Sequence, residues 1–142
     1  MRTAVGVALV LANMAGTATA ADLSLTIEGA RSTRGTVEIC LWSDATGFPD
    51  CGASRTAERR TVAAGALGEP IVFKGLKPGT FAISALHDEN GNGRLDTNFL
   101  GIPKEGIAVS NDALPKFSAP RFADTAFALT GSAGRRITLL YR

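Results

Sequence analysis

The stretch from His87 to Asp96 carries the side-chain oxygens that are best spaced to hold a metal ion. Acidic and amide oxygens recur there at alternate positions, and a glycine stands where the chain must turn sharply, as in the first nine positions of an EF-hand loop. The candidate ligands are Asp88, Asn90, Asn92, the backbone carbonyl of Arg94, and Asp96. Because hard oxygen donors at this spacing suit Ca²⁺, the sequence predicts a calcium site.

This predicted site lacks one ligand of the EF-hand pattern. The twelfth position, where a bidentate glutamate is usual, is Phe99. The remaining coordination must come from water, from carbonyls, or from Glu105, Asp112 or Asp124, so the affinity for calcium should be low. The alternative is that Asp88, Asn90 and Asn92 form Asx turns without any ion, because Asp, Asn and Gly also dominate ordinary turns.

The other reactive residues offer little for catalysis. The chain has one histidine, His87, and two cysteines, Cys40 and Cys51, without a local catalytic motif around them. A lone histidine at the end of a strand usually bonds a carbonyl or faces solvent, whereas a zinc site requires several His or Cys ligands. We therefore expect that the protein is not an enzyme.

The N-terminal residues indicate export. A short apolar run follows Arg2, and Ala18-Thr19-Ala20 supplies small residues at a cleavage-site spacing. This pattern predicts a signal peptide over residues 1–20, a periplasmic or secreted location, and no membrane span in the mature chain, because the run is shorter than a bilayer requires. In an oxidising compartment Cys40 and Cys51 are expected to form a disulfide.

The elements that must position this loop are short strands. Apolar and polar residues alternate over 23–27, 37–41, 70–73, 81–86, 126–129 and 137–141, with a weaker candidate at 55–63. Turn signals separate them, and 70–73 and 81–86 are predicted to form a hairpin or near-hairpin. Residues 21–142 are thus predicted to form a single antiparallel β-sandwich, immunoglobulin-like or transthyretin-like, with one long loop after the strand from Phe81 to Leu86.

Composition excludes one class of partner. With 15 Lys and Arg against 13 Asp and Glu, the formal net charge is only +2. A polyanion-binding protein would carry a large basic field, so we expect no nucleic-acid partner.

Several motifs of the chain resemble the bacterial domain of unknown function (DUF) family 2141. They include Gly47-Phe-Pro49, Gly75-Leu-Lys-Pro-Gly-Thr-Phe81, the whole segment from His87 to Gly106, Ser110-Asn111, and Phe122-Ala-Asp-Thr-Ala-Phe127. The resemblance implies an exported β-sandwich without an assigned activity, and it indicates no catalytic residue.

Three hypotheses about function follow. The first is a non-enzymatic exported protein whose calcium loop is a structural or interaction surface, with an unknown protein or small ligand as partner. The second is a small-molecule or glycan binder that uses the same loop, with Trp42 or Phe99 as an apolar platform and Asp88 or Asp96 as polar contacts. A metal-assisted hydrolase is the third, and it would need an open coordination position and a general base. A concave apolar pocket beside the loop would favour the second hypothesis.

Overall fold

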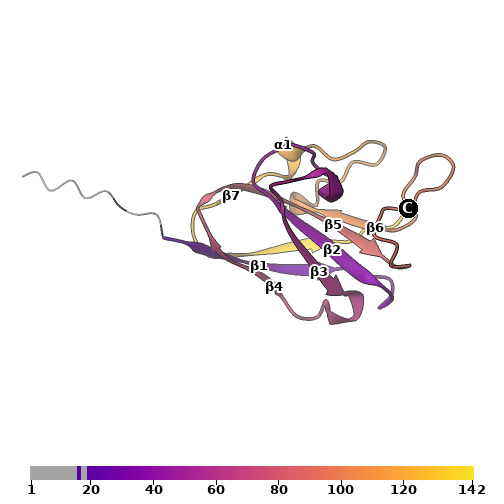
Figure 1. The fold of residues 1–142 in the computed structure, drawn as a ribbon, viewed down its shortest axis with the longest axis horizontal. Helices are drawn as coiled ribbons and strands as arrows, with labels where there is room; N and C mark the ends of the chain where they lie inside the picture. The colour runs from indigo at the N-terminus through magenta and orange to yellow at the C-terminus, as the bar shows by residue number, and fades with distance from the viewer. Residues whose placement is uncertain (1–15, 17–18) are drawn as a thin grey trace, which may run out of the picture.

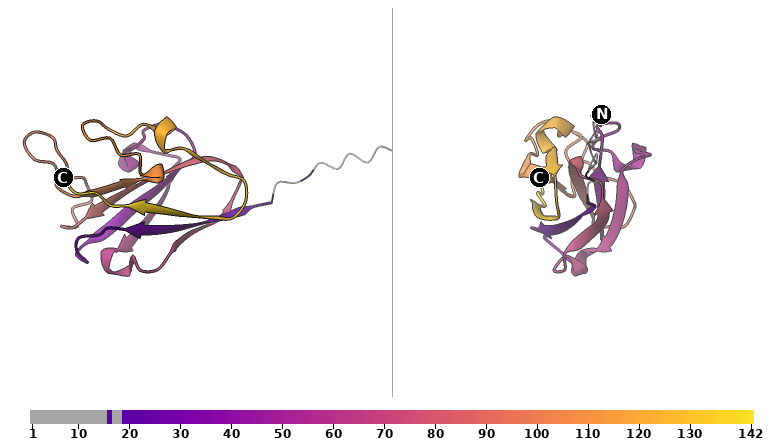
Figure 2. Two further views of the ribbon diagram at one scale, coloured as in Figure 1. Left: turned by 180° about the vertical axis from the view of Figure 1, so that it is seen from behind. Right: turned by 90° about the vertical axis from the view of Figure 1, so that its left-hand side faces the viewer.

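The computed structural model describes residue 16 and residues 19–142 as an all-β sandwich of two facing sheets (Figures 1 and 2). One sheet has the order β4-β1-β8 and the other β3-β2-β5-β6, with β7 paired to β5. The strands are β1 (Ala21–Glu28), β2 (Thr36–Trp42), β3 (Glu58–Ala63), β4 (Ile71–Leu76), β5 (Gly79–Asp88), β6 (Gly106–Val109), β7 (Phe127–Leu129) and β8 (Ala133–Thr138). The predicted all-β sandwich is confirmed, and the choice between immunoglobulin-like and transthyretin-like topology stays a prediction.

Short helical segments connect some of these strands. Three are 3₁₀ turns and one is a single turn of α-helix. They are Cys51–Ala53, Ala64–Ala66, Ser110–Asp112, and α1 (Phe122–Thr125).

The main core lies between the two sheets because alternate residues of each strand point inward. In β1 the side chains of Leu23, Leu25 and Ile27 are buried, while intervening residues are exposed or half-buried. The same alternation brings in further core residues from the other strands, including Val37, Ile39, Leu41, Phe73, Phe81, Ile83, Ala85 and Ile137.

A second apolar cluster covers the opposite, outer face of the five-stranded sheet. It is built on Cys40, Trp42 and Ala82, with Phe48 and Phe122 packed against it. Cys40 and Cys51 form a disulfide with 6.0 Å between their Cα atoms, as the sequence predicted. This cluster explains why both faces of β2 are buried toward its end.

The predicted pairing of 70–73 with 81–86 is wrong. β4 pairs antiparallel with β1, whereas β5 pairs antiparallel with β2. The Pro78-Gly79 turn therefore carries the chain from one sheet to the other. Period-two alternation identifies each strand but contains no information about the sheet to which it belongs.

Two other boundaries differ from the sequence expectation. The closing strand, expected over 137–141, is β8 at Ala133–Thr138, and it pairs parallel with β1. The segment after Leu86 is not one long loop, since it contains the end of β5, the strand β6, a 3₁₀ turn and α1. Strand β6, with the sequence Gly-Ile-Ala-Val, contains no polar residue, so no alternation of apolar and polar residues marks it.

The predicted signal peptide, residues 1–20, lies almost entirely outside the described residues. Among the helices of the described part of the chain, none has the length and apolar character needed to cross a membrane.

Candidate functional site

The loop that joins β5 to β6, residues 89–105, contains the predicted ligands beyond Asp88, which ends β5. Asp88 is 2% exposed, and its carboxylate organises the loop. Its Oδ1 accepts a hydrogen bond from the backbone N–H of Asn92 (3.1 Å), and its Oδ2 accepts one from Gly93 (2.7 Å). Gly93 adopts a φ of 76°, so the turn needs glycine at this position.

The amides of Asn90 and Asn92 surround Asp96. The Nδ2 of Asn90 donates to Oδ2 of Asp96 (2.6 Å), and the Nδ2 of Asn92 donates to both Asp96 oxygens (2.9 and 2.8 Å). These bonds favour the charged carboxylate and so lower the pKa of Asp96. The Oδ1 atoms of the two asparagines accept backbone N–H groups two residues ahead, as in the Asx turns considered from the sequence.

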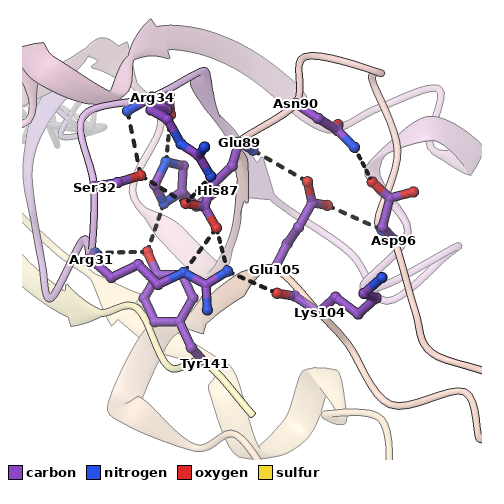
Figure 3. A network of polar contacts seen from close by, with 10 residues as sticks. All are labelled: Arg31, Ser32, Arg34, His87, Glu89, Asn90, Asp96, Lys104, Glu105 and Tyr141. Carbon is purple, nitrogen blue, oxygen red and sulfur yellow. Dashed lines mark hydrogen bonds and ion pairs between the residues drawn. The ribbon is translucent and has the colours of Figure 1, made fainter.

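The carboxylate of Glu105, the last residue of the loop, bridges the backbone of Glu89 and that of Asp96 (Figure 3). Its Oε1 accepts from the backbone N–H of Glu89 (3.2 Å), and its Oε2 accepts from that of Asp96 (3.1 Å). The residue is only 4% exposed. Burial raises the pKa of Glu105, and the nearby carboxylates of Asp96 and Asp88 raise it further.

Of the three distant acidic candidates, only Glu105 contacts this loop. Asp112 accepts the backbone N–H of Thr138, and Asp124 forms an ion pair with Arg121. Within residues 16 and 19–142, no three His, Cys, Asp or Glu side chains are grouped to hold a metal ion. The Nδ2 atoms of Asn90 and Asn92 face Asp96, and their Oδ1 atoms accept backbone N–H groups, so calcium binding by the predicted ligands would require both amides to turn.

A partly buried polar network packs beside the same loop (Figure 3). Oε1 of Glu89 accepts a hydrogen bond from Nε of Arg31 (2.9 Å). Its Oε2 accepts one from Oγ of Ser32 (2.7 Å) and lies 3.5 Å from the guanidinium of Arg34. These bonds, with Arg31 as the largest cause, lower the pKa of Glu89 to about 2. The β1–β2 connection is thereby tied to the start of the 89–105 loop.

His87 has a structural role in this network. The residue is 0% exposed, its Nε2 lies 2.8 Å from the carbonyl oxygen of Arg34, and its Nδ1 lies 2.6 Å from the hydroxyl of Tyr141. Because a carbonyl can only accept, Nε2 carries the proton and Nδ1 accepts from Tyr141. Both ring nitrogens thus have hydrogen-bond partners.

The other side of the 89–105 loop forms one wall of a cavity of about 1170 Å³, here called the outer groove. Leu86 and Ile107 are cross-strand neighbours on the outer face of the sheet and form part of its floor. Residues 114–120, in the connection between the 3₁₀ turn Ser110–Asp112 and α1, form the opposite wall. Both loops project from the sandwich near the C-terminus (Figure 1).

The predicted apolar platforms do not line the outer groove. Trp42 is 1% exposed and belongs to the second cluster, whereas Phe99 is 95% exposed on the 89–105 loop but lies outside the groove lining. Leu100, Ile102 and Phe117 are there instead. A small hairpin presents the first two, with the bridge between Thr97 and Pro103 at its base.

Comparison with known proteins identifies the family. Residues 25–137 match the family model described as an uncharacterized protein conserved in bacteria (DUF2141). The chain belongs to the DUF2141 family. Neither a curated protein nor a solved structure gave a significant match to this DUF2141 chain.

The network around Glu89 is the part of the DUF2141 site that sequence reasoning missed. Arg31 and Ser32 precede Glu89 by 58 and 57 residues, and Tyr141 follows His87 by 54. No local motif connects residues so far apart. The only available signal was a histidine near the end of a largely apolar strand, which indicates a buried polar partner.

The Glu89 network predicts acid sensitivity. The pKa of Glu89 is lowered from 4.5 to about 2. The contribution of this carboxylate to stability is therefore complete above pH 4.5 and is lost as the pH falls toward 2. We expect Glu89→Gln to cost about 1 to 3 kcal/mol at neutral pH, because Arg31 is half-exposed and solvent screens the pair. Urea unfolding curves between pH 2 and 7 measure both effects.

The matched control is Glu58→Gln, which removes a surface ion pair with Arg60. We expect this variant to cost less than about 1 kcal/mol and to keep the acid sensitivity of the parent. Equal stability losses in the two variants, or an unchanged pH profile in Glu89→Gln, would contradict the assignment.

Proposed function

We propose that this DUF2141 protein is an exported, non-catalytic β-sandwich whose 89–105 loop is ordered by calcium and serves as an interaction surface. The observation that carries the proposal is the position of Glu105. Its buried carboxylate reaches the loop from the far end and accepts the backbone N–H groups of Glu89 and Asp96, which makes it the candidate for the acidic group missing at the twelfth position of the calcium pattern. The predicted signal peptide supports the export part.

Charge explains why a cation would favour this arrangement. Asp88 and Glu105 are 2% and 4% exposed, and the charges of Asp88 and Asp96 both raise the pKa of Glu105. The three carboxylates are not grouped to hold a metal ion among the described residues, so a divalent cation would have to draw them together, and it would then replace their repulsion with attraction. The carbonyl of Arg94 and the two asparagine amides would complete a flexible oxygen site that suits Ca²⁺ better than Mg²⁺.

The local contacts of the only histidine and both cysteines support a non-catalytic role. Both nitrogens of His87 are used in buried hydrogen bonds, and Cys40 and Cys51 are joined to each other. A general base needs a nitrogen within reach of substrate, and a cysteine nucleophile needs a thiolate. These groups therefore hold the fold together.

Calcium-dependent stability tests the proposal. We expect the melting temperature of chelator-treated protein to rise by a few degrees in millimolar CaCl₂, and to rise less in MgCl₂. A dissociation constant of about 10⁻⁴ to 10⁻³ M is typical of extracellular modules, and calcium at ten times that value stabilises by about 1.4 kcal/mol. Glu105→Gln should weaken calcium binding about tenfold or more.

The chain offers matched controls for this experiment. Asp124→Asn removes a carboxylate that pairs with Arg121, and it should leave the calcium response unchanged. Asp96→Asn should weaken that response as Glu105→Gln does. If neither melting temperature nor calorimetric heat responds saturably to millimolar calcium, the loop is held by its own Asx turns and the calcium proposal is wrong.

A second candidate function is the binding of a small molecule in the outer groove. The specific observation in its favour is the cavity of about 1170 Å³, with an apolar floor, beside the 89–105 loop. Small-ligand sites are concave, largely apolar and carry a few polar groups, and this groove has those properties. Asp96 connects the two proposals, because its backbone N–H bonds Glu105 and its carbonyl accepts from Lys104 at the base of the hairpin that carries Leu100 and Ile102.

A further inference from the structure

We propose that the outer groove binds a small amphiphile with an aliphatic body and one anionic head group, such as a medium-chain carboxylate. This inference rests on the second candidate function and adds the chemical class of the ligand. It depends on two separate observations, namely the apolar side chains that line the groove and the charges around it.

We infer the apolar body of the ligand from the large apolar side chains that the two loops expose in the groove. Of the seven large apolar side chains that are exposed in the described part of the chain, four line this one groove. They are Leu95, Leu100, Ile102 and Phe117. Scattered exposed apolar residues are normal, whereas a concentrated group on facing walls marks a binding surface. An aliphatic chain would cover them together with Leu86 and Ile107 on the floor.

The anionic head follows from the charges of the lining residues. Four are basic, Arg59, Arg94, Lys116 and Arg142, and two are acidic, Glu38 and Asp50. Asp50 already accepts the backbone N–H of Gly52. Within the described residues, neither Arg94 nor Lys116 takes part in any of the ion pairs. One positively charged side chain therefore lies on each wall, and both would attract an anionic group bound between them.

The shape of the site favours a single molecule over a membrane surface. Drug-sized ligands occupy pockets of about 300 to 1,000 Å³, so a groove of about 1170 Å³ has room for one such ligand. The wall formed by residues 114–120 is tied to the end of the chain, because the guanidinium of Arg142 donates to the carbonyls of Pro115 and Lys116.

Nuclear magnetic resonance titrations with three simple probes test the inference. Decanoate has both parts of the ligand, decyltrimethylammonium has the same chain with a cationic head, and butyrate has the charge with little apolar body. We expect decanoate to bind about tenfold more tightly than decyltrimethylammonium, and butyrate to show no saturable binding. The backbone amides that shift should be those of residues 84–86, 93–103 and 114–120.

Paired variants separate the apolar and charged contributions. Phe117→Ser should weaken both alkyl probes, whereas Phe99→Ser, an equally exposed aromatic outside the groove lining, should change neither. Lys116→Glu should weaken decanoate about tenfold and strengthen decyltrimethylammonium. Lys74→Glu, on β4 in the other sheet, is the charge control and should have no effect.

The outcomes distinguish this inference from the function on which it rests. Equal affinity for both alkyl probes, weakened alike by Phe117→Ser, would overturn the anionic head while keeping the groove as a binding site. Failure of both alkyl probes to bind would overturn both. Binding to anionic phospholipid vesicles, without saturable binding of monomeric decanoate, would identify a membrane surface and also overturn the inference.

Discussion

Replacing Gly35 with alanine is expected to destabilise the protein by about 2 to 5 kcal/mol. Gly35 has a φ of 69°, and a Cβ atom built on it would lie 2.0 Å from the carbonyl oxygen of Asp88. The contact is with backbone, so no side-chain rotation can relieve it. Either β2 or the end of β5 must move, although Thr36 and Asp88 are strand partners there. Urea unfolding measures the loss.

Gly75→Ala is the matched control for this substitution. Gly75 has nearly the same φ, 68°, but nothing lies within 4 Å of its would-be Cβ atom. It should therefore show only the cost of the left-handed backbone, about 1 to 2 kcal/mol. Equal losses in the two variants would mean that the approach of Gly35 to Asp88 does not constrain the fold. Since Asp88 is also a proposed calcium ligand, Gly35→Ala should weaken the calcium response, and Gly75→Ala should not.

Trp42→Ala is expected to cost about 3 to 5 kcal/mol, the usual range for removing a buried tryptophan. Trp42 is 1% exposed, and its ring meets Phe48 edge-on with 5.2 Å between ring centroids. Its Nε1 donates to Oγ of Ser84 over 2.8 Å. The substitution leaves a cavity over the outer face of β2, beside the disulfide, where the surrounding strands cannot close in. Guanidinium unfolding followed by far-ultraviolet circular dichroism measures the change.

Two further variants identify the source of this loss. Trp42→Phe keeps most of the apolar volume but leaves Ser84 without its donor, so it should cost about 1 to 3 kcal/mol. Phe117→Ala removes an aromatic ring that is 98% exposed and should change stability by less than about 0.5 kcal/mol. A Trp42→Ala variant as stable as Phe117→Ala would show that the second cluster contributes nothing to the fold.

Gly35 and Trp42 each support one part of the proposed sites, the first the 89–105 loop and the second the sheet under the outer groove. Gly35 fixes the end of β5, where the loop begins. Trp42 and the disulfide cover the outer face of the sheet on which the groove is built. The stability of the sandwich therefore determines how precisely the proposed calcium and ligand sites are presented.

The alternation of apolar and polar residues was sufficient to predict most strands. Leu23, Leu25 and Ile27 are buried on one face of β1 as their spacing requires. The pairing of Cys40 with Cys51 also followed from sequence, because two cysteines 11 residues apart across a turn can reach each other. Local patterns fix local structure, since strand period and turn chemistry depend on nearby residues only.

Tertiary structure alone decided how distant segments meet. The chain after β4 enters the other sheet, and β8 pairs parallel with β1, although neither choice changes the local apolar pattern. Asp112, Asp124 and Glu105 were equal candidates to complete the calcium loop until the fold placed only Glu105 against it. Likewise, Leu100 and Phe117 face one groove because two separate loops project from the same sheet. Such contacts join residues far apart in the chain, and their energy depends on three-dimensional proximity that residue type and spacing do not specify.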